Sequence, residues 1–229
     1  MKTINFRIFI TGFLPFDRFT SNPSGDAASA LGQMQRLEAL GPNGVPLVGL
    51  ISAKVVDVVW SHDPTNPNMK GAADEIEAEI ETISPHVVLS LGMAAGNFRV
   101  ERRATDIDDA IADNRGFAPS TGRREFPRDP VTRKTWLPYQ KIEKKWKSMG
   151  IRNVEESSNA GRFLCEDVFY RVMRIAQGHL HGTRILRAGF IHVPEPGRMA
   201  QAQINEAISA AIGVTLSDVR VDEYPRGAR

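Results

Sequence analysis

A thiol, an imidazole and a carboxylate in this chain have the side-chain chemistry that amide hydrolysis requires. Cys165 is the only cysteine, His192 lies near the end of an apolar run over residues 185–193, and Glu101 follows another apolar run over residues 87–91. A thiolate attacks a carbonyl carbon, an imidazole transfers the protons, and a carboxylate orients the ring and stabilises its charged form. These residue types predict nucleophilic catalysis by a cysteine hydrolase.

The expected setting of Cys165 would activate its thiol. If Cys165 lies in the first turn of a helix that begins near Ala160, the positive end of the helix dipole lowers the thiol pKa below its reference value of about 8.5. A structural alternative exists for both reactive residues. A lone cysteine on an apolar helix is most often a buried hydrophobic residue, and His192, between Ile191 and Val193, also suits a core position.

The composition is that of a folded protein, not of a membrane-spanning or fibrous one. The chain has 229 residues, of which 41% are hydrophobic and 24% charged, and 29 basic against 27 acidic residues give a formal net charge of +2. So small an excess predicts no attraction to nucleic acid or to anionic lipid. No apolar run reaches the roughly 18 residues of a membrane helix, and a single cysteine needs no oxidising compartment, so we expect a cytoplasmic protein.

The hydrophobic pattern predicts alternating strands and helices. Apolar runs indicate strands over residues 6–12, 46–55, 87–92 and 185–193, and residues 151–155 are a further, short candidate strand. Apolar residues three and four apart indicate helices over residues 25–40, 72–83, 137–149, 160–177 and 199–212. Residues 97–135 have no clear periodicity and are expected to form a long loop.

These elements predict an α/β fold. Because the strands are continuously apolar, both faces of the sheet need covering helices. We expect a single domain over residues 1–217, a three-layer α/β/α sandwich around an open, mostly parallel twisted sheet, followed by a loosely held polar tail over residues 218–229. Ligands in such sheets bind beyond the carboxyl ends of the strands, where the runs before Glu101 and His192 end.

The remaining charged clusters favour neither a metal nor a cofactor. One part of the long loop is crowded by Arg123, Arg124, Arg128, Arg133 and Lys134. Such a run is most often a solvated loop face. Asp106, Asp108 and Asp109 lack the glycine and terminal glutamate of a calcium loop, and no phosphate-binding or dinucleotide-binding motif is present, so we expect no metal site and no cofactor.

Short motifs follow one another over nearly the whole length of the chain. They are TGFLPF (11–16), NPS (22–24), LGMAAG (91–96), ERRA (101–104), IDDA (107–110), DNRG (113–116), SNAGRFLC (158–165) and GFIHVP (189–194). In this order and spacing the motifs resemble the pyroglutamyl peptidase I family, the pyrrolidone-carboxylate cysteine peptidases. The resemblance implies Cys165 as nucleophile, His192 as base and acid, and Glu101 as the orienting carboxylate.

The resemblance also implies a substrate pocket and a partner. It places Phe13, Phe16 and Phe163 around the lactam ring of pyroglutamate, with Asn22 and the backbone near Met93 fixing the ring amide. A flat, uncharged ring suits aromatic walls, whereas a free α-ammonium would be buried without a counter-ion. The implied activity is that of an exopeptidase hydrolysing the amide bond after the N-terminal pyroglutamyl residue of a blocked peptide. The resemblance further suggests a homo-oligomer, either a tetramer or a dimer.

At several positions the chain departs from the family's pattern. Ile111 stands where the family has an arginine associated with the developing oxyanion, Arg162 replaces a threonine, and Glu166 replaces an asparagine. Loss of one oxyanion donor costs on the order of 10²–10³ in rate. Two alternatives follow: a catalytically impaired relative that acts as a binding or interaction protein, and a hydrolase with altered cyclic-amide specificity.

Overall fold

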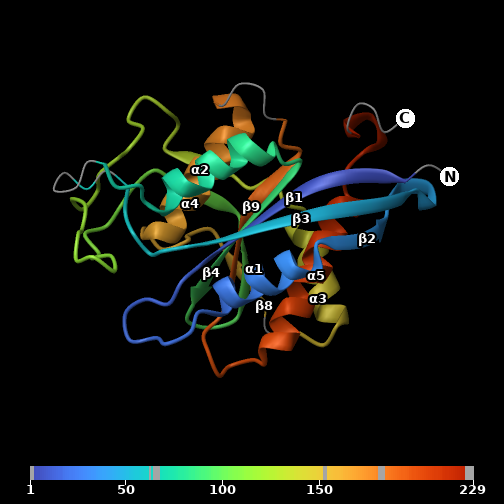
Figure 1. Cartoon of the computed structure of the whole chain (residues 1–229), viewed down its shortest axis with the longest axis horizontal. Helices are drawn as coiled ribbons and strands as arrows, with labels where there is room; N and C mark the ends of the chain where they lie inside the picture. The colour runs from blue at the N-terminus through green and yellow to red at the C-terminus, as the bar shows by residue number, and fades with distance from the viewer. Residues whose placement is uncertain (1–2, 62, 64–67, 152–153, 180–183, 225–229) are drawn as a thin grey trace.

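The computed structural model describes residues 3–61, 63, 68–151, 154–179 and 184–224, and its centre is a sheet with helices on both faces (Figure 1). The strands of this sheet are β1 (Ile4–Phe13), β2 (Arg36–Leu40), β3 (Pro46–Val56), β4 (Val87–Ala94), β5 (Phe98–Glu101), β8 (Val154–Ser157) and β9 (Arg187–Pro194). The helices are α1 (Pro23–Met34), α2 (Ala72–Ile83), α3 (Tyr139–Ser148), α4 (Leu164–Arg174) and α5 (Gln201–Ser217). The α/β fold expected from the sequence is confirmed.

The sheet is mostly parallel, with two reversals. Its strand order is β2-β3-β1-β4-β9-β5-β8. Strands β3, β1, β4 and β9 run parallel, whereas β2 is antiparallel to β3, and β5 is antiparallel to β9. The reversal at β5 brings its amino end to the edge where the carboxyl ends of β4 and β9 lie.

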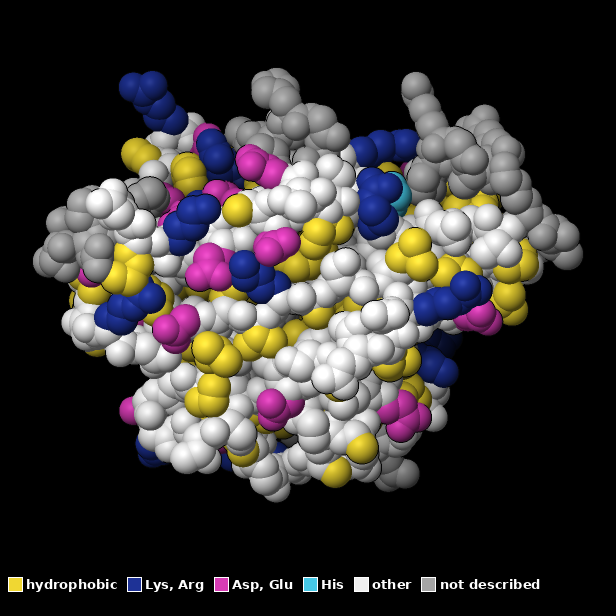
Figure 2. All heavy atoms as spheres, viewed as in Figure 1, with side chains coloured by type: hydrophobic (Ala, Val, Ile, Leu, Met, Phe, Trp, Pro, Cys, Tyr) yellow, Lys and Arg dark blue, Asp and Glu magenta, His cyan; other side chains and the backbone are white. Residues whose placement is uncertain are grey.

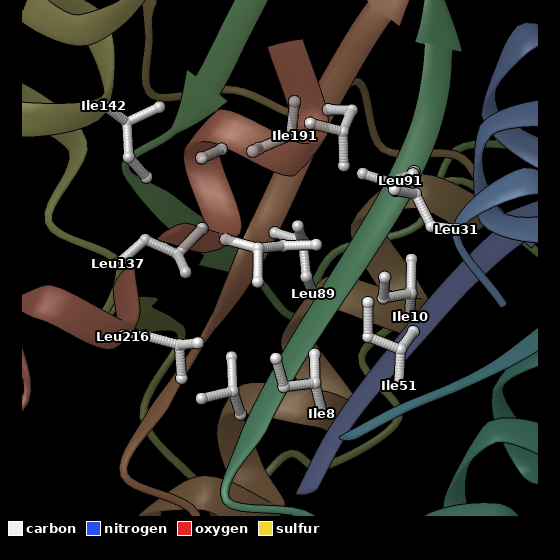
Figure 3. Packing of buried hydrophobic residues seen from close by; sticks show 14 of the residues in the cluster. Ile8, Ile10, Leu31, Ile51, Leu89, Leu91, Leu137, Ile142, Ile191 and Leu216 are labelled. Atoms are coloured by element: carbon white, nitrogen blue, oxygen red, sulfur yellow. The ribbon is translucent and has the colours of Figure 1, made fainter. Parts of the chain in front are cut away.

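Each face of the sheet packs against its own set of helices. Helices α1, α3 and α5 cover one face, and α2 and α4 cover the other (Figure 1). Within β1, Ile8 and Ile10 belong to the core beneath α1, α3 and α5, seen with Leu89 and Ile191 in Figure 3. Phe9 belongs to the core beneath α2 and α4. Both faces are therefore apolar, which explains why the strands read as continuous hydrophobic runs.

The predicted helix over residues 25–40 is wrong in its second half. Helix α1 ends at Met34, Gln35 takes a left-handed conformation with φ 57°, and the chain continues as the edge strand β2. In β2, burial alternates along the strand, with Leu37 half-buried and Leu40 exposed. Leu37 and Leu40 are three residues apart, which matches the spacing of a helix face. In a strand, residues three apart lie on opposite faces, and this is their arrangement in β2.

The segment expected to be one long loop contains more structure than predicted. It holds β5 and a separate hairpin-like pair, β6 (Arg103–Thr105) and β7 (Thr132–Lys134). Its acidic and basic residues pair with one another: Arg123 with Asp108 at 2.9 Å and Arg124 with Asp106 at 3.2 Å. Among the described residues, no group of three or more His, Cys, Asp or Glu could hold a metal ion.

The strand predicted over residues 151–155 lies further along the chain, as β8 over Val154–Ser157, and residues 152–153 lie outside the described residues.

On the face shown in Figure 2, acidic and basic side chains are interspersed with small apolar patches, and neither acidic nor basic side chains form a continuous patch. Within the described parts of the chain, no helix has the length and apolar character needed to cross a bilayer.

The segment after α5 is held firmly as far as it is described, which contradicts the expected loose tail. Arg187 of β9 pairs with Asp218 at 3.3 Å and with Glu223 at 3.1 Å. Tyr224 is buried and meets the ring of Phe6 edge-on at a centroid distance of 5.8 Å. Residues 225–229 lie outside the described residues.

Candidate active site

A cavity of about 180 Å³ opens where the carboxyl ends of β4 and β9 meet the start of α4. Its lining includes seven of the eight site residues predicted from the sequence: Phe13, Phe16, Asn22, Met93, Phe163, Cys165 and His192. The eighth, Glu101, lies buried behind His192. A larger, open groove of about 1110 Å³ beside β2, α3 and α5 contains none of them.

The turn before α4 places Cys165 at the amino end of that helix. Gly161 and Arg162 both have positive φ, 100° and 50°, so the chain reverses sharply before the cap residue Phe163. The helix begins at Leu164, and Cys165 is therefore in its first turn, as the sequence analysis required. Backbone N–H groups in a first helical turn have no acceptor within the helix, and they favour negative charge beside them.

Close packing against β4 fixes the position of the Cys165 sulfur. A methyl group built on Gly92 would lie 2.8 Å from Cys165 Sγ and 2.7 Å from the ring of Phe190. No real side chain tolerates contacts this short without movement of its neighbours. The absence of a side chain at Gly92 is what allows the thiol to rest on the sheet.

His192 and Glu101 form a buried hydrogen-bonded pair across β9 and β5. Nδ1 of His192 lies 2.8 Å from Oε1 of Glu101, whose side chain is completely buried. Because a carboxylate has no proton to donate, the hydrogen lies on Nδ1, and Nε2 is the acceptor of the neutral ring. The ring of Phe190 packs 5.0 Å from the imidazole centroid and limits its rotation. This pair has the geometry of a base and its orienting carboxylate.

The lowered thiol pKa expected from the helix dipole is wrong in direction. Burial, together with the nearby carboxylates of Glu101 and Glu166, raises the pKa of the Cys165 thiol to about 12, while the backbone N–H of Cys165 acts in the opposite direction. The neutral thiol is therefore the resting form near pH 7. The dipole acts at Cys165, but desolvation outweighs it.

Glu166, the residue after Cys165, is buried and binds the backbone of two separate segments. Its carboxylate accepts hydrogen bonds from the N–H of Thr105 and, at 2.9 Å, from that of Ala160. Burial raises the pKa of Glu166 to about 7, with these backbone N–H groups acting in the opposite direction. The two carboxylate oxygens of Glu166 thus join two segments of the chain, since Oε1 accepts from Thr105 and Oε2 from Ala160.

Aromatic side chains form one wall of the cavity. Phe16 and Phe163 have ring centroids 5.9 Å apart, and Trp60 meets Phe163 edge-on at 5.5 Å. The indole of Trp60 is fixed from behind, since its Nε1–H donates to the carbonyl of Ile111 at 2.9 Å. Ile111 therefore supports the wall through its backbone, while its side chain is 42% exposed.

Asn22 has a structural task in addition to its place in the cavity. Its Oδ1 accepts from the N–H and the hydroxyl of Ser24 and caps α1, and its Nδ2 donates to the carbonyl of Leu14 at 3.0 Å. One N–H of the amide has no partner among these contacts. Asn22 thus holds both the start of the loop that follows β1, through Leu14, and the start of α1, through Ser24.

Two arginines near the site differ from what the sequence suggested. Arg162 is half-exposed, lies 3.7 Å from Asp109, and is not among the residues that line the cavity. Arg99, which the sequence analysis did not consider, does line it. The sequence held only a partial signal for Arg99: it precedes Glu101 by two residues, and residues two apart in a strand share a face, but the direction of that strand was not visible. Trp60 was also missed, and no local pattern pointed to it.

The chain is similar to known proteins along most of its length. A family model described as pyroglutamyl peptidase matches residues 6–222. The chain is 32% identical to a pyrrolidone-carboxylate peptidase of Bacillus subtilis over 192 residues, which are 82% of this chain and 78% of that protein. It is 29% identical to a pyrrolidone-carboxylate peptidase of Cupriavidus taiwanensis over 97% of this chain and 98% of that protein.

Solved structures are similar along the same length. The crystal structure of Bacillus amyloliquefaciens pyroglutamyl peptidase I matches with a TM-score of 0.75 and 26% identity, covering 93% of this chain and 97% of that one. A mutant pyrrolidone carboxyl peptidase from the hyperthermophile Pyrococcus furiosus matches with a TM-score of 0.76 and 26% identity, covering 93% and 100%.

Proposed function

The chain belongs to the pyroglutamyl peptidase family and is a cysteine peptidase that removes N-terminal pyroglutamate, and we propose that Cys165, His192 and Glu101 carry out this reaction. The observation that supports the assignment best is the Glu101–His192 pair at 2.8 Å, whose imidazole lines the same cavity as Cys165. The cavity also has the aromatic wall that a lactam ring needs.

The first half of the reaction forms a thioester. Because the resting thiol is protonated, His192 Nε2 takes its proton as Sγ attacks the pyroglutamyl carbonyl carbon. Nε2 then gives this proton to the nitrogen of the following residue, the amide bond breaks, and the shortened peptide leaves with a free amine. Glu101 stabilises the imidazolium that exists between the two transfers.

The second half regenerates the enzyme. A water molecule loses a proton to Nε2 and attacks the thioester carbonyl, and the sulfur leaves as pyroglutamate forms. The proton on Nε2 returns to the thiolate. Each half of the reaction therefore passes one proton through the same ring nitrogen.

The oxyanion is stabilised by the start of α4. The backbone N–H groups of Leu164 and Cys165 are in the first turn and have no acceptor within the helix, so they can donate to the carbonyl oxygen as its charge develops. This arrangement supplies donors in the absence of an arginine at position 111. The activity therefore does not require Ile111 to take part through its side chain.

Substrate recognition uses the aromatic wall and two polar positions. Phe13, Phe16 and Phe163 enclose the lactam ring, and Asn22 and the backbone at Met93 bind its amide. A free α-ammonium would be buried there without a partner, so an unblocked peptide is excluded. We also propose a cytoplasmic location, where the thiol stays reduced. The homo-oligomer suggested by the resemblance stays a prediction, and sedimentation equilibrium would measure the oligomeric state.

The activity test uses a pyroglutamyl fluorogenic amide with the purified chain under reducing conditions. We expect turnover that is lost in Cys165→Ala and in His192→Gln, and that falls by at least about 10²-fold in Glu101→Gln. A matched proline amide is expected to stay intact, since it has the free amine that the pocket excludes. Absence of turnover from well-folded protein between pH 6 and 9 would contradict the assignment.

A further inference from the structure

Four residues form one row across the sheet at the active edge. The Cα register places Gly92 of β4 beside His192 of β9, His192 beside Arg99 of β5, and Arg99 beside Glu155 of β8. Partners in register present their side chains on the same face of a sheet. The Cys165 sulfur rests on this face at Gly92. The row therefore runs from the nucleophile past the base to a guanidinium.

The guanidinium of Arg99 is not fully used by the protein. Its Nη2 donates to the carbonyl of Ala95, while its Nε is buried without a hydrogen bond and lies 3.7 Å from Glu155 Oε2. Glu155 itself also accepts from the amide of Asn97 at 2.9 Å. Among the described residues that line the cavity, Arg99 is the only lysine or arginine.

The order of residues in the row fixes the side of the substrate that Arg99 meets. The aromatic wall comes from the loop after β1 and from Phe163, and β1 is the neighbour of β4 on the side away from β9. The lactam ring thus lies on one side of the sulfur and the departing peptide on the other, above His192. The next position in the row is Arg99, so the residue that follows pyroglutamate approaches it.

We propose that Arg99 binds a carboxylate carried by the residue that directly follows pyroglutamate, and that it makes such peptides preferred substrates. The inference rests on the proposed function and adds a substrate class to it. Two sources present the same group: the side chain of aspartate or glutamate, and the terminal carboxylate of a pyroglutamyl dipeptide. The Nη1 group of Arg99, which makes no hydrogen bond to a described residue, is the donor available to either one.

Four substrates separate the outcomes. They are pyroglutamyl-alanine amide as the neutral reference, pyroglutamyl-glutamate amide, pyroglutamyl-alanine with a free carboxylate, and pyroglutamyl-lysine amide. We expect kcat/KM to exceed the neutral reference by about fivefold or more for at least one carboxylate substrate, and to fall below it for the lysine substrate. This preference is expected to decrease as salt is raised, because the ion pair is screened.

Three variants assign the preference to Arg99. In Arg99→Gln the ratio of carboxylate to neutral kcat/KM is expected to fall to about one, and Arg99→Lys is expected to restore part of it. Glu155→Gln removes a competing negative charge and is expected to raise the ratio. Arg162→Gln, which removes the same charge outside the cavity, is the matched control and is expected to leave the ratio unchanged.

The two proposals fail in different ways. Cleavage of none of the four substrates by folded protein overturns the peptidase mechanism. Cleavage of the neutral reference with a carboxylate ratio near one, or with a ratio that Arg99→Gln does not alter, overturns the role of Arg99 alone. A ratio that falls in Glu155→Gln also contradicts it, since a purely structural ion pair would respond in that direction.

Discussion

In the proposed mechanism, the nucleophile Cys165 is a neutral thiol in the free enzyme. Burial and two carboxylates raise the pKa of Cys165 to about 12, so the proton must leave through His192 during attack and not before it. A neutral thiol is a poor nucleophile toward solvent-borne oxidants and alkylating agents, because the thiolate is the reacting species. In the proposed mechanism, the protonated thiol therefore depends on the Glu101–His192 pair to accept its proton during attack.

The rate of alkylation of the free enzyme measures how much of Cys165 is thiolate at each pH. With the thiol pKa at about 12, the rate of Cys165 modification by iodoacetamide is expected to rise about tenfold for each pH unit from 7 to 10. Glu166→Gln removes one of the carboxylates that raise the Cys165 pKa, so Cys165 in this variant is expected to react faster than in the unaltered chain. The difference is expected to be larger above pH 7, where Glu166 is ionised.

The control for this experiment is Glu156→Gln, whose side chain is 75% exposed. Its alkylation profile is expected to follow that of the unaltered chain. A rate that is already constant below pH 8 would show that a thiolate–imidazolium pair exists at rest, and would refute the neutral-thiol description.

At the scale of the elements, the site depends on how α4 lies on β4 and on the direction of β5. Helix α4 brings Cys165 down onto Gly92, and β5 carries both Glu101 and Arg99 to the sides of His192. Since β5 is antiparallel to β9 and parallel to β8, the amino ends of β5 and β8 lie at the edge where the carboxyl ends of β4 and β9 meet. The reversed strand β5 thereby supplies both Arg99 and Glu101 beside His192.

Substitution of Gly92 tests the contact between α4 and β4. In Gly92→Ala the new methyl group must displace Cys165 Sγ or the Phe190 ring, so kcat for the pyroglutamyl amide is expected to fall by about tenfold or more, with a smaller change in KM. Gly213→Ala in α5, where an added methyl group meets nothing within 4 Å, is the matched control. Equal kcat values for the two variants would mean that the thiol position tolerates the shift.

At the scale of the whole molecule, the two helical layers and the final segment hold the sheet that carries the site. The core between the sheet and α1, α3 and α5 includes Leu137, Ile142 and Leu216 (Figure 3), and extends to Val219 and Tyr224 beyond α5. Arg187, at the start of β9, is joined to Asp218 and Glu223. The strand that ends at His192 is therefore anchored at its other end by the segment after α5.

Truncation tests this anchoring. Removal of residues 218–229 takes away two buried apolar side chains and both acidic partners of Arg187, so the free energy of unfolding is expected to fall by about 3 kcal/mol or more in urea titrations. Removal of residues 225–229 alone keeps these contacts and is the control. If the long truncation does not fold, Glu223→Gln is expected to lower the urea midpoint more than Asp222→Asn, an exposed neighbour. Equal midpoints would contradict the anchoring.

The sequence by itself determined the α/β class, most of the strands and helices, and the identity of the candidate site residues, because continuous apolar runs and short motifs are local properties. Tertiary structure decided the rest. The edge strand β2 was read as helix because Leu37 and Leu40 fit both spacings, and only pairing with β3 distinguishes them. The thiol pKa was expected to fall, because a helix start is visible in the sequence whereas burial beside Glu101 is not. Arg99 was missed because it lies beside His192 only when β5 runs antiparallel to β9. That direction is set by which strands pair in the sheet, and the local sequence does not show it.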